Sequence, residues 1–136
     1  MDTLLIGCSD GQVARRLEAL LAEMGYPDAH RLLVPGGTLP LIRHGSERRV
    51  TLACVREIVE AHDVRLIVLV AHQECAAYQR ALGGLGFDQQ ELLERDLRTV
   101  KRLLVSEFSG VDVRSFVIPW CEDGERAAFG PAALVD

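Results

Sequence analysis

Two patterns of apolar residues alternate along the chain. Continuous apolar runs are typical of strands buried on both faces of a parallel sheet, and apolar residues at every third or fourth position are typical of helices with one buried face. The runs predict strands at residues 3–8, 31–34, 66–70 and 116–118, with a short edge strand at 133–135. The periodic stretches predict helices over about 13–24, 50–62 and 89–108, and a short helix after residue 75 that ends near Gly83 and Gly84.

This alternation of strands and helices predicts βαβ units and therefore a mainly parallel sheet. We expect an α/β domain of three layers, with a four- to five-stranded sheet in the middle. The chain has 136 residues, of which 49% are hydrophobic and 26% charged, enough for one domain with a hydrophobic core. No repeat or linker divides it, so residues 1–136 are predicted to form a single domain.

Charge and composition exclude several classes of protein. The net charge is −5, from 15 basic and 20 acidic side chains, which argues against nucleic acid and anionic membranes as partners. No apolar run approaches the roughly 20 residues that span a bilayer, and the first residues do not resemble a secretion signal. We therefore expect a cytoplasmic protein, whose four cysteines are free thiols or metal ligands.

Two predicted strand ends carry unusual chemistry. Cys8 and Asp10 follow the first strand, and His72 and Cys75 follow the strongest one. If these strands are neighbours, the four side chains meet in one crevice, because ligands of parallel sheets bind beyond the carboxyl ends of strands. Two thiolates, an imidazole and a carboxylate suit tetrahedral zinc.

Other interpretations of these residues stay open. Cysteine is often buried simply as a small hydrophobic residue. Residues 7–11 match the Gly-x-Ser-x-Gly turn of α/β-hydrolases, with Ser9 as nucleophile, but no acid that would complete a triad precedes His72. Cys8 and Cys75 could form a redox pair, although no Cys-x-x-Cys motif is present. The histidines outside the motif, at positions 30, 44 and 62, are isolated in the sequence and are predicted to be surface or capping residues.

The spacing of these residues resembles a known family. Cys8-Ser9-Asp10, followed downstream by His72-x-x-Cys75, is similar to the Cys-x-Asp-x-Arg and His-x-x-Cys motifs of the β-class carbonic anhydrases. The resemblance implies the α/β fold of the β-class carbonic anhydrases and a homodimer. It also implies one zinc ion per chain, bound by Cys8, His72 and Cys75. It also implies reversible hydration of carbon dioxide to bicarbonate through zinc-bound hydroxide, with Asp10 as a gate or proton acceptor. Gly36 and Gly37 follow the second strand, and their amides are candidates for lining the substrate site.

One position departs from the family motif. Gln12 stands where the family has an arginine that pairs with the aspartate and draws it off the metal. Glutamine is neutral, so Asp10 is free to become a fourth zinc ligand and to close the site. Three functions follow as alternatives: a zinc-dependent lyase, a non-catalytic zinc-binding homologue, or a related hydrolase of a small molecule such as carbonyl sulfide or carbon disulfide.

Overall fold

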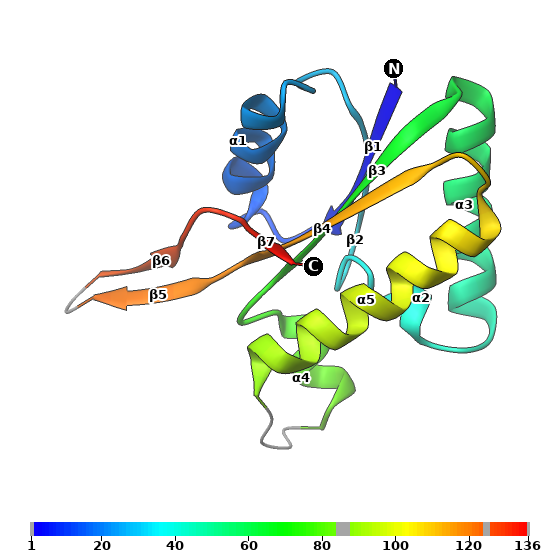
Figure 1. Ribbon diagram of the computed structural model, residues 1–136. Helices are drawn as coiled ribbons and strands as arrows, with labels where there is room; N and C mark the ends of the chain where they lie inside the picture. The colour runs from blue at the N-terminus through cyan, green and yellow to red at the C-terminus, as the bar shows by residue number, and fades with distance from the viewer. Residues whose placement is uncertain (1, 84–87, 124–125, 136) are drawn as a thin grey trace.

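A five-stranded sheet with helices on both faces forms the centre of the computed structural model, which describes residues 2–83, 88–123 and 126–135 (Figure 1). In chain order the elements are β1 (Asp2–Cys8), α1 (Ala14–Met24), β2 (His30–Val34), α2 (Leu39–Ile42), α3 (Ser46–His62), β3 (Val64–His72), α4 (Ala76–Ala81), α5 (Gln89–Glu107), β4 (Asp112–Ile118), β5 (Trp120–Asp123), β6 (Arg126–Phe129) and β7 (Ala133–Val135).

The order of strands in the sheet is β2-β1-β3-β4-β7. The first four strands are parallel, and β7 pairs with β4 in the antiparallel direction. Figure 1 shows α1 on one side of the sheet and α3 and α5 on the other. The predicted α/β architecture of three layers around a mainly parallel sheet is confirmed, and β1 and β3 are neighbours.

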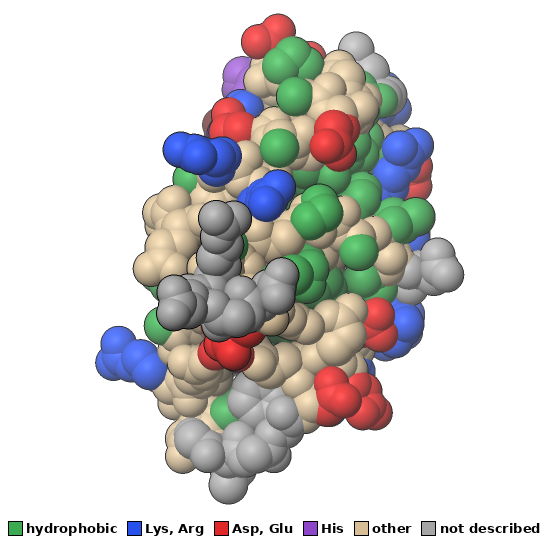
Figure 2. Space-filling model, turned by 90° about the vertical axis from the view of Figure 1, so that its left-hand side faces the viewer, with side chains coloured by type: hydrophobic (Ala, Val, Ile, Leu, Met, Phe, Trp, Pro, Cys, Tyr) green, Lys and Arg blue, Asp and Glu red, His purple; other side chains and the backbone are tan. Residues whose placement is uncertain are grey.

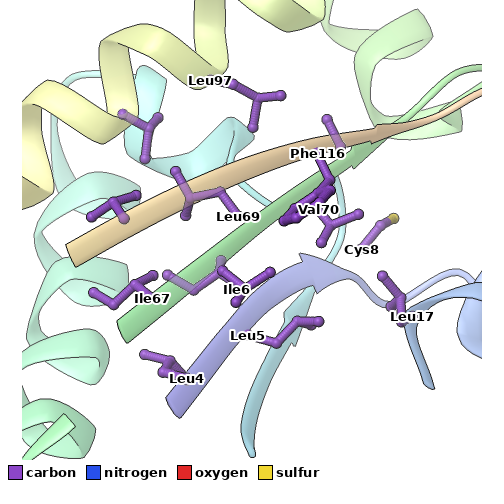
Figure 3. Packing of buried hydrophobic residues seen from close by; sticks show 14 of the residues in the cluster. Leu4, Leu5, Ile6, Cys8, Leu17, Ile67, Leu69, Val70, Leu97 and Phe116 are labelled. Atoms are coloured by element: carbon purple, nitrogen blue, oxygen red, sulfur yellow. The ribbon is translucent and has the colours of Figure 1, made fainter. Parts of the chain in front are cut away.

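The central strands are buried because almost every side chain in them is apolar. Figure 3 shows side chains of β1 and β3 packed together, with Leu97 of α5 and Leu17 of α1 approaching them from the helices. Leu97 is fully buried, and burying a leucine side chain contributes about 1.5–3 kcal/mol. This packing fixes the strand ends on which the candidate site is built.

Local signals explain where the helices begin and end. Gly25 ends α1 in the left-handed conformation (φ 83°), and its amide donates to the last carbonyls of that helix. Asp88 caps α5, because its carboxylate accepts a hydrogen bond from the Glu91 amide at 3.0 Å. The structure begins α3 at Ser46, before the predicted start at residue 50, because the first turn is polar and exposed and so lacks the apolar pattern.

The β5–β6 hairpin and the short helix α2 were not predicted. The hairpin projects away from the sheet after β4 (Figure 1). Trp120 and Phe129 lie opposite each other in it, with ring centroids 4.9 Å apart. The hairpin strands contain four residues each, too few to show alternation of polar and apolar positions. The predicted end of the helix after Cys75 lies partly outside the described residues, because Gly84 is not among them.

Candidate metal centre

Three side chains meet where β1 and β3 end. Cys8 is the last residue of β1, His72 is the last residue of β3, and Cys75 lies immediately before α4. The two sulfur atoms and an imidazole nitrogen of His72 all lie within 4.8 Å of one another. All three residues are buried. The parallel pairing of β1 with β3 causes this convergence, because parallel strands bring their carboxyl ends to the same edge.

The His72 ring is oriented by its own backbone segment. Its Nδ1 lies 2.7 Å from the Gln73 carbonyl oxygen, to which Nδ1–H donates. The other ring nitrogen, Nε2, is buried and has no hydrogen-bond partner. The ring edge packs against Phe129 of the hairpin, with centroids 5.2 Å apart. A buried nitrogen without a partner is rare and unfavourable, and a second ring nitrogen donating to a carbonyl is the usual arrangement of a metal-binding histidine.

The surroundings of the two cysteines favour a thiolate. A hydrogen bond from Cys75 lowers the pKa of Cys8 against the opposing effect of burial, and His72 acts in the same direction as Cys75. The same hydrogen bond raises the pKa of Cys75, and burial raises it further. Burial is the largest effect on His72 and lowers its pKa, but the Cys8 sulfur, the Gln73 carbonyl and the charge of Asp10 together outweigh burial and raise the pKa of His72.

Backbone amides point toward both sulfur atoms. Hydrogen bonds from the amides of Asp10 and Gly36 lower the pKa of Cys8. Hydrogen bonds from the amides of Tyr78 and Ala77 also lower the pKa of Cys75, although the net shift of Cys75 is upward. Together with the unpartnered Nε2, these features fit a bound cation that takes two thiolates and one imidazole. Zinc prefers this ligand set.

Asp10 is not part of the three-residue cluster. Its carboxylate accepts a hydrogen bond of 2.9 Å from the backbone amide of Gln12, an Asx turn. Within the described part of the chain, Asp10 has no ion pair with an arginine. Arg16 of α1 donates to the Phe129 carbonyl at 2.9 Å. A backbone amide therefore holds the carboxylate that an arginine would hold in the family motif.

Gly36 and Gly37 lie beside the cluster, and both need the left-handed conformation (φ 81° and 62°). A Cβ at position 37 would lie 3.1 Å from the backbone nitrogen of Cys8, so only glycine lets this turn approach β1 so closely. In the structure, the tight turn lies against the end of β1, and the Gly36 amide lies near the Cys8 sulfur. The predicted contact of Gly36 and Gly37 with substrate stays a prediction.

Several polar residues that the sequence did not mark hold the segment between His72 and Cys75. The Gln73 side chain accepts from the Trp120 amide and donates to Gln90, both at 2.9 Å. Glu74 has a positive φ of 56°, and its amide and carboxylate both bind the Gln89 side chain at 2.7 Å. These contacts tie the segment to the hairpin and to α5. No motif reveals them, because the partners are distant in sequence.

A buried hydrogen bond fixes α4, which begins directly after Cys75. The hydroxyl of Tyr78 donates to Asp96 of α5 at 3.0 Å, and both residues are buried. Burial raises the pKa of Tyr78, and the charge of Asp96 adds to that effect. The turn that carries Cys75 is thereby joined to the longest helix.

The comparisons with known proteins agree with this geometry. The chain resembles the β-carbonic anhydrase CafD of Aspergillus fumigatus, with a TM-score of 0.58 and 16% identity over 96% of this chain and 89% of that one. It also resembles one of two tetrameric β-carbonic anhydrases of Sordaria macrospora, with a TM-score of 0.53 and 15% identity over 97% and 82% of the two chains. The chain has the fold of the β-carbonic anhydrases.

Sequence similarity is weaker than this structural similarity. No protein-family model matches the sequence of this chain. Uncharacterized protein RC0076 of Rickettsia conorii is 30% identical over 87 residues, which are 60% of this chain and 45% of that protein. The chain therefore spans less than half of the length of that relative. No helix among the described residues is long and apolar enough to cross a membrane.

Proposed function

We propose that this β-carbonic-anhydrase-like chain is a single zinc-binding domain that holds one zinc ion through Cys8, His72 and Cys75. The observation that carries the proposal is the buried His72 ring, whose Nε2 has no hydrogen-bond partner and which has a nitrogen within 4.8 Å of two buried sulfur atoms. We further propose a cytoplasmic location, because thiol ligands need reducing surroundings to stay free of disulfides.

The reaction proposed for this site is the reversible hydration of carbon dioxide to bicarbonate. When bound, zinc supplies Lewis-acid activation of water near neutral pH. Asp10 is proposed to orient the reacting water and to accept its proton. The hydrogen bond from the Gln12 amide supports this role, because it holds one carboxylate oxygen outside the cluster of ligand atoms.

A non-catalytic zinc protein is the second candidate. The observation that favours it is the absence of an arginine ion pair on Asp10 among the described residues. The Gln12 amide carries no positive charge and makes one hydrogen bond, whereas an arginine is a cation that can bind a carboxylate with two. The Gln12 amide is therefore a weaker restraint on Asp10 than an arginine, and the carboxylate can compete with water for the metal.

Stopped-flow hydration of carbon dioxide tests these candidates. We expect wild-type protein to be slow near pH 7 and faster as the pH rises, because hydroxide then competes better with the carboxylate. Gln12→Arg should increase the rate by adding a charged, two-pronged hydrogen bond to Asp10. Cys8→Ser supplies the background rate of protein without the metal.

Three results would contradict the proposal. A wild-type rate equal to that of Cys8→Ser at every pH, with no gain in Gln12→Arg, would favour the non-catalytic protein. Hydrolysis of carbonyl sulfide or carbon disulfide in the same assay, without hydration of carbon dioxide, would favour the hydrolase. A zinc content well below about one ion per chain in wild-type protein would contradict the proposed zinc site itself, on which all of these functions depend.

We also propose that the chain forms a homodimer. The similar protein of Sordaria macrospora is described as tetrameric. Figure 2 shows hydrophobic side chains gathered on the side of the molecule that carries α1 and the β5–β6 hairpin. Leu134 of the edge strand β7 is a large apolar side chain that is 63% exposed.

Light scattering coupled to size-exclusion chromatography tests the dimer. Leu134→Glu should shift the mass toward the monomer, because it places a charge at an exposed apolar position of the edge strand β7. Val105→Glu, at a comparably exposed position on α5, is the matched control and should leave the mass unchanged. A monomer mass for wild-type protein at all concentrations would overturn the proposal.

A further inference from the structure

A second group of metal-ligating side chains lies at the opposite end of the sheet. Asp2 begins β1, His30 begins β2, and His62 ends α3. One ligand atom from each of these residues lies within 4.8 Å of the others. Because Asp2 and Cys8 are at opposite ends of β1, this group is separate from the centre formed by Cys8, His72 and Cys75.

We propose that Asp2, His30 and His62 bind a divalent transition-metal ion. Two imidazole nitrogens and one carboxylate oxygen suit Zn²⁺ and Ni²⁺, whereas Mg²⁺ and Ca²⁺ require mainly oxygen ligands. His30 is half-buried and the other two are exposed, so the ion reaches the group from solvent and keeps water as its remaining ligands.

An ion pair between His30 and Asp2 does not account for the whole arrangement. His30 Nε2 lies 3.3 Å from the Asp2 carboxylate, as an ion pair requires. His62, however, stacks on His30 with ring centroids 3.9 Å apart and an angle of 23° between the rings. Protonating both stacked rings would place like charges in contact. A metal ion instead uses both imidazoles in their neutral form.

The position of His62 also favours a cation. It is the last residue of α3, a helix of 17 residues, and the carboxyl end of a helix carries partial negative charge. The site therefore combines a carboxylate, two imidazoles and a helix end from three elements that are distant in sequence. A bound ion would link the starts of two strands to the end of the helix that connects them to β3.

Metal binding must change the ring stack. Imidazole lone pairs lie in the ring plane, and zinc takes nitrogen at about 2.0–2.1 Å. Two nearly parallel rings cannot both direct their lone pairs at one ion, so one ring must tilt. His62 is exposed and is the ring that can move. Binding is thus expected to be weaker than at the buried cysteine centre, and to alter the surroundings of both imidazoles.

The test is a calorimetric titration of untagged, zinc-loaded protein with Ni²⁺. One added equivalent of Ni²⁺ should bind, and the imidazole proton signals of His30 and His62 should broaden, because octahedral Ni²⁺ is paramagnetic. His30→Ala and His62→Ala should each weaken this binding at least about tenfold. Asp2→Asn tests the carboxylate with little change of shape. His44→Ala, at an exposed histidine outside the group, is the control and should have no effect.

The outcome is independent of the proposed function. A variant with both Cys8→Ser and Cys75→Ser removes the first centre and should still bind one equivalent of Ni²⁺ through His30 and His62. No added equivalent in wild-type protein would overturn the proposal. So would an equivalent whose affinity is unchanged in both His30→Ala and His62→Ala.

Discussion

Tyr78→Phe removes a single hydroxyl from the contact that positions α4. That hydroxyl donates to the Asp96 carboxylate at 3.0 Å in buried surroundings. Among the described residues, the other partner of this carboxylate is Arg95, whose Nη2 is 3.4 Å away and whose side chain is 70% exposed. The variant therefore leaves a buried carboxylate with one weak, solvent-facing partner.

The expected loss of stability in Tyr78→Phe follows from the geometry of this hydrogen bond. A hydrogen bond to a charged group contributes about 1.5–3 kcal/mol, and the poor Arg95 contact offsets little of it. For a chain of this length, about 1 kcal/mol corresponds to roughly 3–5 °C in Tm. We therefore expect the free energy of unfolding to fall by about 1.5–3 kcal/mol and the Tm by about 5–15 °C. Zinc affinity should fall as well, because the Tyr78 amide lies against the Cys75 sulfur.

Urea denaturation and competition with a zinc chelator measure these two quantities. Tyr26→Phe is the matched control, because Tyr26 is only partly buried and its hydroxyl has no hydrogen bond within the described residues. A double-mutant cycle with Asp96→Asn isolates the energy of the pair. The reasoning would be refuted if Tyr78→Phe lost no more stability than Tyr26→Phe, or if the cycle gave no coupling.

Three further predictions concern the core and the site. Gly37→Ala should cost at least about 1–2 kcal/mol in urea denaturation, because it forces a left-handed alanine against β1, whereas Gly11→Ala, with open space around it, should be nearly neutral. Leu97→Ala should cost about 2–5 kcal/mol by the same measurement, since this side chain is fully buried. Removing the metal with a chelator should lower the Tm of wild-type protein, and a Cys75→Ser protein that responded equally would contradict the assigned ligand.

Much of the architecture could be predicted because it depends on local patterns. The apolar runs of β1 and β3 mark strands buried on both faces, and such strands imply a parallel sheet. The convergence of Cys8 and His72 followed from that architecture, on the condition that the two strands are neighbours. The order of strands provides that condition, and it depends on how the helices pack and not on any short motif.

Contacts between distant residues could not be predicted. His30 and His62 were expected to be isolated, yet they stack because the start of β2 and the end of α3 meet at one edge. The hairpin was missed, although its Phe129 contacts the His72 ring. The amide of Gln12 holds Asp10, a contact that residue identity does not reveal, since every residue except proline has this donor.

The unequal exposure of the four cysteines gives the protein a natural reporter of its own folding. Cys54 and Cys121 are exposed, whereas Cys8 and Cys75 are buried. A thiol reagent added in brief pulses during refolding should modify the first two at all times, and they serve as an internal standard. Cys8 and Cys75 become protected only once β1 has paired with β3, which joins distant parts of the chain and is expected to be slow. Protection of these two thiols would therefore time the formation of the central sheet in the wild-type sequence, without an engineered cysteine.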